Sequence, residues 1–278
     1  MSVKDLKLSG GNRLCQNGAH GGHGEPLVTV VTAVFNAVNT IKGCIESVLS
    51  QDYPDIEHIV IDGGSTDGTI DVLREYDDRI AFWVSERDAG VYDAWNKALD
   101  LARGEWVGFL GADDEYLPGA IAAYVTLARD NPSAEYLSSQ LEWLHPSGYS
   151  RLIGVPWNSG FRRCNCIGHV GSLHRRRLFE RYGRFDTTYR IAADYEFLLR
   201  AGGDLNAAFM PTVTAVMRAG GISDTTAGLL EAKRAQVENK IHSALGAERQ
   251  FYSRLIRFYG RRLVIKATAF FKGRKNRH

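Results

Sequence analysis

Residues 27–68 read LVTVVTAVFNAVNTIKGCIESVLSQDYPDIEHIVIDGGSTDG, and this stretch decides the fold. Two apolar runs of strand length, residues 27–35 and 56–62, flank a segment at residues 38–50 with a helical pattern. Two parallel strands need a long crossover between them, and that crossover is usually a helix. The stretch therefore predicts a strand, helix and parallel strand in succession.

The same alternation continues toward the C-terminus. Further strands are predicted at residues 80–85 and 106–110, and helices at residues 69–75 and 91–102. Later elements are a helix at 117–128, a strand at 135–143, a helix from Leu173, a helix at 193–201, a strand at 207–217 and two helices after Thr226. The predicted fold class is α/β, a Rossmann-like and mostly parallel sheet flanked by helices, with further helices at the C-terminus.

Charge is distributed unevenly along the 278 residues. The chain has 34 basic and 32 acidic side chains, but residues 251–278 contain nine Lys or Arg and no acid. The first 250 residues therefore hold 25 bases against 32 acids, and this acidic body disfavours nucleic-acid binding. A content of 44% hydrophobic and 24% charged residues is typical of a globular protein.

The N-terminal segment differs in composition from the rest of the chain. Residues 1–25 are rich in Gly, Asn and His and lack apolar periodicity, so we expect a flexible leader. No apolar run is long enough for a membrane span, and we find no secretory signal. Because the chain has only four cysteines, we expect a cytoplasmic protein with reduced thiols.

Polar residues follow the predicted strands at the edge where an α/β sheet binds its ligands. Ala33 and Phe35 end the first strand, where backbone groups should line a crevice, although an ordinary strand-to-helix turn is the alternative. Asp62 ends the second strand before a turn of Gly, Ser and Thr. Its carboxylate can accept hydrogen bonds from a base or a ribose, and it could equally serve the turn alone.

A second polar group surrounds the start of the helix that follows the third strand. Asp88, Tyr92 and Lys97 lie there beside Gly90. A solvated helix start explains the charges, but it explains less well a tyrosine next to a glycine. We therefore include these three side chains among the candidate substrate contacts.

The fourth strand ends in two adjacent carboxylates, Asp113 and Asp114. Two neighbouring anions repel each other, and a shared cation at the edge of the sheet relieves that repulsion. Oxygen ligands of this kind suit Mg²⁺ or Mn²⁺, which often completes its shell with substrate phosphates. The pair predicts a divalent cation and a diphosphate ligand, although two exposed acids leading into a helix remain the alternative.

Four motifs together resemble the family 2 glycosyltransferases, a group of inverting enzymes with the GT-A fold. They are TVVTAVFN at 29–36, DGGSTDGT at 62–69, ERDAGVYDAWNKA at 86–98 and GADDEYLP at 111–118. The likeness extends over residues 26–225, which implies a GT-A domain there and a basic, helical extension at 226–278. The arrangement looks most like bacterial enzymes of exopolysaccharide, O-antigen or capsule assembly.

Carried over residue by residue, the resemblance implies a role for each matching position. The backbone near Ala33 and Phe35 would hold the base together with Asp62, and Asp113 would contact the ribose. Asp114 would ligate the metal on the diphosphate. Asp194 would be the catalytic base, and the acceptor-side segment would contribute His169, Arg175 and Arg176. His169 could also be a loop histidine whose hydrogen bonds are made within the protein. Arg175 and Arg176 could lie on a solvated helix face.

Two positions depart from the family pattern. The metal motif usually has an acid two places before the position of Asp113, where this chain has Gly111. The acidic pair that usually precedes an aromatic residue is reduced to Ala193 and Asp194, so one carboxylate remains for the base. A helix N-terminus at Asp194 would favour its ionised form.

The basic C-terminal segment forms an amphipathic helical pattern. Its apolar face comprises Tyr252, Leu255, Ile256, Tyr259, Leu263 and Phe270, opposite Arg254, Arg257, Arg261 and Lys272. Such a helix can lie in a membrane interface, which would put the protein on the inner face of the cell membrane. It could instead pack on the catalytic domain.

These patterns predict an inverting glycosyltransferase that moves a sugar from a nucleotide diphosphate sugar to a glycan or polyprenyl-linked acceptor. Two alternatives stay open at this point. One is a catalytically silent scaffold that binds nucleotide sugars, and the other is a nucleotidyltransferase, which also uses paired carboxylates and a metal.

Overall fold

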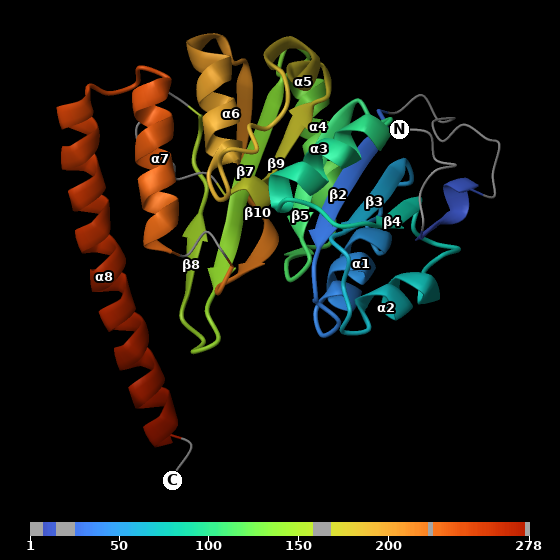
Figure 1. The fold of residues 1–278 in the computed structure, drawn as a ribbon, viewed down its shortest axis with the longest axis horizontal. Coiled ribbons are helices and arrows are strands. Elements are labelled where there is room, and N and C mark those ends of the chain that lie inside the picture. Colours follow the sequence, from blue (N-terminus) through green and yellow to red (C-terminus); the bar gives the residue numbers. More distant parts are fainter. Residues whose placement is uncertain (1–7, 15–25, 158–167, 222–224, 276–278) are drawn as a thin grey trace.

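A mixed sheet organises the part of the chain that the computed structural model describes, residues 8–14, 26–157, 168–221 and 225–275. The sheet has ten strands in the order β1-β4-β3-β2-β5-β9-β7-β10-β6, and β8 pairs with β7 (Figure 1). The prediction of an α/β fold built on a mostly parallel sheet is confirmed.

The N-terminal half of the sheet is parallel. β2 (Val28–Val34) lies between β3 (Ile56–Asp62) and β5 (Trp106–Gly111), and β4 (Phe82–Ser85) follows β3. Their carboxyl ends therefore meet at one edge. This edge positions the polar residues that come after the strands.

The C-terminal half mixes strand directions. β9 (Ser172–Arg175) joins β5 to β7 (Tyr136–Leu144) with antiparallel pairing on both sides. β10 (Ala207–Arg218) runs parallel to β7, while β6 (Glu115–Tyr116) and β8 (Ser150–Ile153) pair antiparallel with β10 and β7. The short β6 brings the segment after β5 against the end of β10.

Helices cover both faces of the sheet because side chains of one strand alternate between the faces. Val28 and Val30 of β2 belong to one core with α1 (Ile41–Leu49), α2 (Thr69–Glu75) and α4 (Ala120–Asp130). Val31 belongs to the other core with α3 (Val91–Leu101), α5 (Arg177–Tyr182) and α6 (Ala193–Ala201). The parallel strands are nearly continuous apolar runs because both faces are buried.

Two expectations need correction. The predicted helix from Leu173 is β9, and helix α5 begins only at Arg177, because a short apolar run does not distinguish strand from helix. The second expectation concerns residues 1–25, which were expected to form a flexible leader but include ordered residues. Ser9–Gly10 form β1 at the edge of β4, and Arg13 forms an ion pair with the buried Glu57. The other residues of 1–25 lie outside the described ranges.

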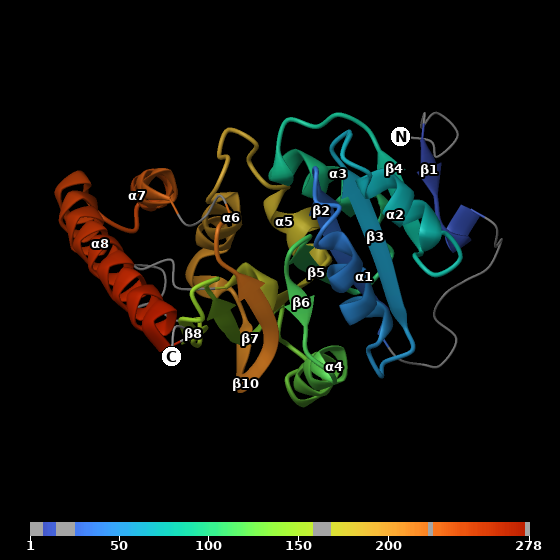
Figure 2. The same cartoon turned by 90° about the horizontal axis from the view of Figure 1, so that it is seen from below.

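Two helices end the described chain, α7 (Thr226–Glu238) and the long α8 (Ala244–Lys275). Figures 1 and 2 both show α8 at the side of the molecule beyond β8, far from β3 and β4. Within the described ranges, no helix combines the length and apolar character that crossing a membrane requires.

Candidate active site

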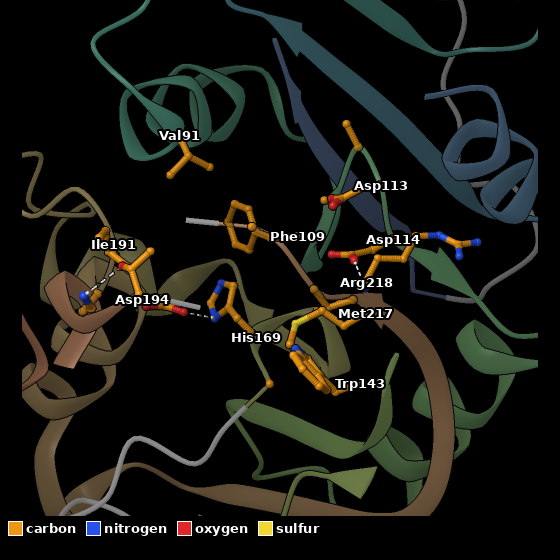
Figure 3. A pocket seen from close by; sticks show the side chains of 18 of the residues that line it. Val91, Phe109, Asp113, Asp114, Trp143, His169, Ile191, Asp194, Met217 and Arg218 are labelled. Atoms are coloured by element: carbon orange, nitrogen blue, oxygen red, sulfur yellow. Dashed lines mark hydrogen bonds and ion pairs between the residues drawn. The ribbon is translucent and has the colours of Figure 1, made fainter. Parts of the chain in front are cut away.

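One cleft of about 870 Å³ opens at the edge of the sheet where β2 and β5 end. Its lining includes Ala33 and Phe35 after β2, Asp113 and Asp114 after β5, and Asp194 at the start of α6. In Figure 3, Asp194 and His169 face the cleft from one side and Asp113 and Asp114 from another. Residues from both halves of the sheet therefore meet in one site.

Polar side chains gather around Gly63, next to Phe35 of the cleft lining, although Asp62, Gly63 and Asp88 are not themselves part of that lining. A Cβ at Gly63 would lie 2.8 Å from Asp88 Oδ2 and 3.4 Å from Phe35, so the glycine permits this close approach. Asp62 Oδ2 accepts hydrogen bonds from the N–H groups of Gly64 and Ser65 and from the Ser85 hydroxyl. Among the described residues, none forms a hydrogen bond with the buried Asp62 Oδ1.

The two carboxylates after β5 fold back over Gly111. Asp114 is 5% exposed, and its Oδ1 accepts a hydrogen bond of 2.9 Å from the backbone N–H of Arg218. Burial, with a smaller contribution from the Asp113 charge, raises the pKa of Asp114 to about 7. A Cβ at Gly111 would lie 2.5 Å from Asp114 Oδ2, so the usual acid at that position would collide with the pair.

Asp194 lies in the first turn of α6. Its Oδ1 is 3.1 Å from the Tyr92 hydroxyl and accepts a hydrogen bond of 2.8 Å from the N–H of Tyr195. The side chain is 23% exposed, toward the cleft. Burial raises its pKa to about 6, so desolvation outweighs the effect expected from the helix N-terminus. Tyr92 is thus a neighbour of the carboxylate, and its hydroxyl also lies 2.7 Å from the carbonyl of Ile191.

His169 lies between Asp194 and a layer of aromatic rings. Its Nδ1 is 3.9 Å from Asp194 Oδ2, and its ring stacks on Trp95 and Phe109 at centroid distances of 5.1 and 5.3 Å. Burial lowers its pKa to about 3, so the imidazole is neutral at physiological pH. Its buried Nε2 has no hydrogen-bond partner in the part of the chain that the structure describes. His169 is therefore a fixed, uncharged polar group in the cleft wall.

Besides Asp62 and Asp88, three further predicted substrate contacts lie outside the cleft lining. Lys97 Nζ is 2.8 Å from Glu86 and 3.5 Å from Asp93, outside the lining of the cleft. Arg175 pairs with Glu105 at the amino end of β5, opposite the cleft. Arg176 pairs there with Glu180 and donates to the carbonyl of Gly104. The structure therefore does not bring these three side chains to the cleft, and their predicted roles remain predictions.

The sequence did not single out several residues that line the cleft. They include Asn36, Trp95, Phe109, Trp143, Arg151, Met217 and Arg218. Arg254, Arg257 and Arg261 of α8 also line it, although their amphipathic pattern suggested a membrane surface. Their spacing along the helix was the available signal, but it does not say which side packs on the body.

Sheet order and cleft define the class, a glycosyltransferase of the GT-A fold. A solved mannosyltransferase of Pyrobaculum calidifontis, in complex with GDP-Man and Mn²⁺, matches 95% of this chain and 87% of its own with a TM-score of 0.59 and 20% identity. The model of glycosyl transferase family 2 matches residues 29–162.

Relatives in sequence identify the family. An uncharacterized glycosyltransferase of Mycobacterium tuberculosis is 34% identical over 188 residues, which cover 63% of this chain and 69% of that protein. The PGL/p-HBAD biosynthesis glycosyltransferase of the same species is 29% identical over 214 residues, 72% of this chain and 80% of the relative. The chain belongs to glycosyltransferase family 2.

Proposed function

We propose that this enzyme transfers a sugar, with inversion, from a nucleoside diphosphate sugar to a glycan or polyprenyl-linked oligosaccharide of the cell surface. The observation that carries the proposal is that Asp114 and Asp194, from two distant segments, line the same cleft. Inverting transfer needs charge stabilisation at the leaving group and a proton acceptor on the opposite side of the reacting carbon. The two carboxylates supply one group for each task.

The nucleoside end of the donor is assigned to the residues around Gly63. The unpartnered Oδ1 of Asp62 can accept a hydrogen bond from a base N–H. Phe35 is 64% exposed in the cleft and offers a ring face to the base, and Ala33 lines the same end. Asp88 approaches this group within the space that Gly63 leaves. The GDP-Man complex of the matched mannosyltransferase supports a donor of this class.

Asp113 and Asp114 would hold a divalent cation, Mg²⁺ or Mn²⁺. Burial of a carboxylate next to a second one disfavours the ionised pair, and a bound cation reverses that effect. The described residues contain no group of three or more His, Cys, Asp or Glu arranged as a metal site. The donor diphosphate and water would provide further ligands, and the ion would neutralise charge on the departing diphosphate. The Mn²⁺ in the matched mannosyltransferase supports this choice.

Asp194 is proposed as the base that accepts the proton of the acceptor hydroxyl. Its Oδ1 is held by Tyr92 and Tyr195, which leaves Oδ2 for the incoming hydroxyl. With a pKa of about 6, the carboxylate is mostly ionised at neutral pH and binds a proton more strongly than an ordinary aspartate. The neutral His169 beside it adds no competing positive charge.

Contact of α8 with the cytoplasmic face of the membrane is part of the proposal. Five apolar side chains on the side of α8 away from the cleft are 54–74% exposed, namely Leu245, Tyr252, Ile256, Tyr259 and Leu263. Such a stripe can enter the acyl boundary of a bilayer. Flotation with vesicles containing anionic phosphatidylglycerol should recover the wild type. Ile256→Ser should reduce recovery, whereas Leu230→Ser, at an exposed position of α7, should not. Equal recovery of both variants would contradict this contact.

Product analysis with a panel of nucleotide sugars and Mn²⁺ tests the proposed reaction. We expect release of a nucleoside diphosphate from the wild type, and none above background from Asp194→Asn, which should still bind the donor. Release of pyrophosphate would identify a nucleotidyltransferase. Nucleotide binding without turnover of any donor by either form would indicate a silent scaffold.

A further inference from the structure

The cleft has a second wall, formed at its other end by β7, β8 and α8. We call it the arginine wall, and it consists of Trp143, Arg151, Arg254, Arg257, Phe258 and Arg261. Figures 1 and 2 place α8 far from β3 and β4, where the nucleoside end of the donor is assigned. The wall therefore lies on the side of the molecule away from the strands assigned to the nucleoside.

The wall is built from residues that support one another. Buried Phe258 and Ile265 attach α8 to the body. The guanidinium groups of Arg151 and Arg261 lie 5.4 and 5.6 Å from the centre of the Trp143 ring, so one aromatic side chain supports two cations. Arg261 is also 5.6 Å from the Phe258 ring.

Arg254, Arg257 and Arg261 form a row on α8. Their spacing of three and four residues puts them on one side of the helix, over a length of about 10 Å at 1.5 Å per residue. The amphipathic pattern left open whether this helix meets a membrane or packs on the catalytic domain, and these three cations line the cleft. A row of this length can contact more than one anionic group of a single ligand.

The charge of the cleft changes from one end to the other. Its acidic lining residues among the described ones, Asp113, Asp114 and Asp194, lie near the ends of β5 and the start of α6. Among the described residues, the arginine wall contributes four cations to the lining and no acid. Neighbouring cations raise the local positive potential and favour an anionic ligand. Guanidinium groups match phosphate oxygens because they can donate two parallel hydrogen bonds.

We propose that the arginine wall is the acceptor subsite and that it binds phosphate groups of the acceptor. The acceptor class is therefore a phosphate-bearing glycan, in which the phosphate lies close to the hydroxyl that receives the sugar. This inference rests on the proposed function, because it takes the opposite end of the cleft as the donor site. A phosphate joined to a lipid and a phosphate within a soluble glycan present the same chemistry to the wall.

Binding of inorganic pyrophosphate without divalent cations is the first test. The full-length protein should bind it by calorimetry in EDTA, and should still bind it in EDTA when a saturating nucleoside diphosphate is present. Arg257→Gln should raise its Kd about tenfold, the expected loss for one charge-assisted hydrogen bond. Lys266→Gln removes one charge from an exposed position of the same helix outside the cleft and should leave Kd within about twofold. Displacement of pyrophosphate by the nucleotide, or equal effects of both substitutions, would overturn the proposal.

Acceptor kinetics distinguish the two sources of phosphate. Candidate hexoses are tested as methyl glycosides, as 1-phosphates and as farnesyl diphosphate conjugates. Arg257→Gln should raise KM about tenfold for phosphate-bearing acceptors only, without changing donor KM or melting temperature. An effect with the 1-phosphate shows that soluble phosphate suffices, and an effect restricted to the conjugate identifies a lipid-linked acceptor. A higher KM for the donor, or preferred use of methyl glycosides, would overturn the inference while leaving the proposed sugar transfer intact. Failure of the proposed function would instead appear as absence of turnover in the wild type.

Discussion

Replacing Asp194 by Asn is predicted to stabilise the folded protein. Burial raises the pKa of this carboxyl from its ordinary 3.8 to about 6, so the folded state binds the proton more tightly than the unfolded state. The stabilising effect of the protonated form is complete below pH 3.8 and is lost as the pH rises through 6. Above both values, the desolvated charge costs about 3 kcal/mol, at about 1.36 kcal/mol per pH unit.

Asparagine avoids this cost because it carries no charge. Its side-chain oxygen can still accept the hydrogen bonds from Tyr92 and from the N–H of Tyr195. We therefore expect Asp194→Asn to increase the free energy of unfolding by up to about 3 kcal/mol at pH 7.5. At pH 4.5 the gain should fall to about 1 kcal/mol, because much of the wild-type carboxyl is then protonated.

Urea denaturation at the two pH values measures this difference. Asp71→Asn is a suitable control, since the Asp71 side chain is 75% exposed and its pair with Arg74 lies on the surface. Its effect should stay below about 1 kcal/mol. A loss of stability in Asp194→Asn, or a gain of equal size at both pH values, would refute the assigned desolvation. The same substitution should lower the transfer rate by about 10²- to 10⁴-fold.

Three further predictions concern the surroundings of the site. Gly111→Asp introduces the acid that the family pattern usually has at this position. Because its Cβ would lie 2.5 Å from Asp114 Oδ2, we expect at least about a tenfold loss of Mn²⁺-stimulated transfer. Equal or higher activity of the variant in a titration with Mn²⁺ would contradict this expectation. Glu231→Gln weakens the carboxylate that accepts three consecutive backbone N–H groups just before Asp194. It should lower kcat and leave the Kd of the donor unchanged, at a cost in stability of about 1 kcal/mol, and a changed donor Kd would argue against a positioning role. Arg175→Gln should lower the melting temperature through loss of its ion pair, with no effect on donor or acceptor KM; a raised KM would return Arg175 to the substrate site.

The convergence of Asp62, Asp113 and Asp114 could be predicted from the sequence because it depends on topology alone. Asp62 is the last residue of β3, Asp113 and Asp114 follow the end of β5 within three residues, and the carboxyl ends of β3 and β5 lie at one edge of the sheet. Asp194 does not come after such a strand. Only the resemblance to a family pointed to it, and the fold then brings α6 to the same cleft.

Arg175 and the arginines of α8 show what the sequence alone leaves undetermined. Arg175 belongs to a short segment that could be helix or strand, and as the end of β9 it points to the amino end of β5. For α8, periodicity separates two sides of the helix but does not determine which side packs on the body. Only Ala247, Phe258 and Ile265 are buried among its described side chains, while the longer apolar stripe remains exposed. The few buried side chains of α8 therefore determine that Arg254, Arg257 and Arg261 face the cleft.

A crystal structure of Asp194→Asn with Mn²⁺ and a nucleotide sugar tests the central claim most directly. We predict anomalous scattering from Mn²⁺ beside Asp113 and Asp114, and an anomeric carbon that lies between the diphosphate and the side chain at position 194. A donor whose anomeric carbon points away from position 194, or a metal bound elsewhere, would contradict the proposed division of work between the two carboxylate sites.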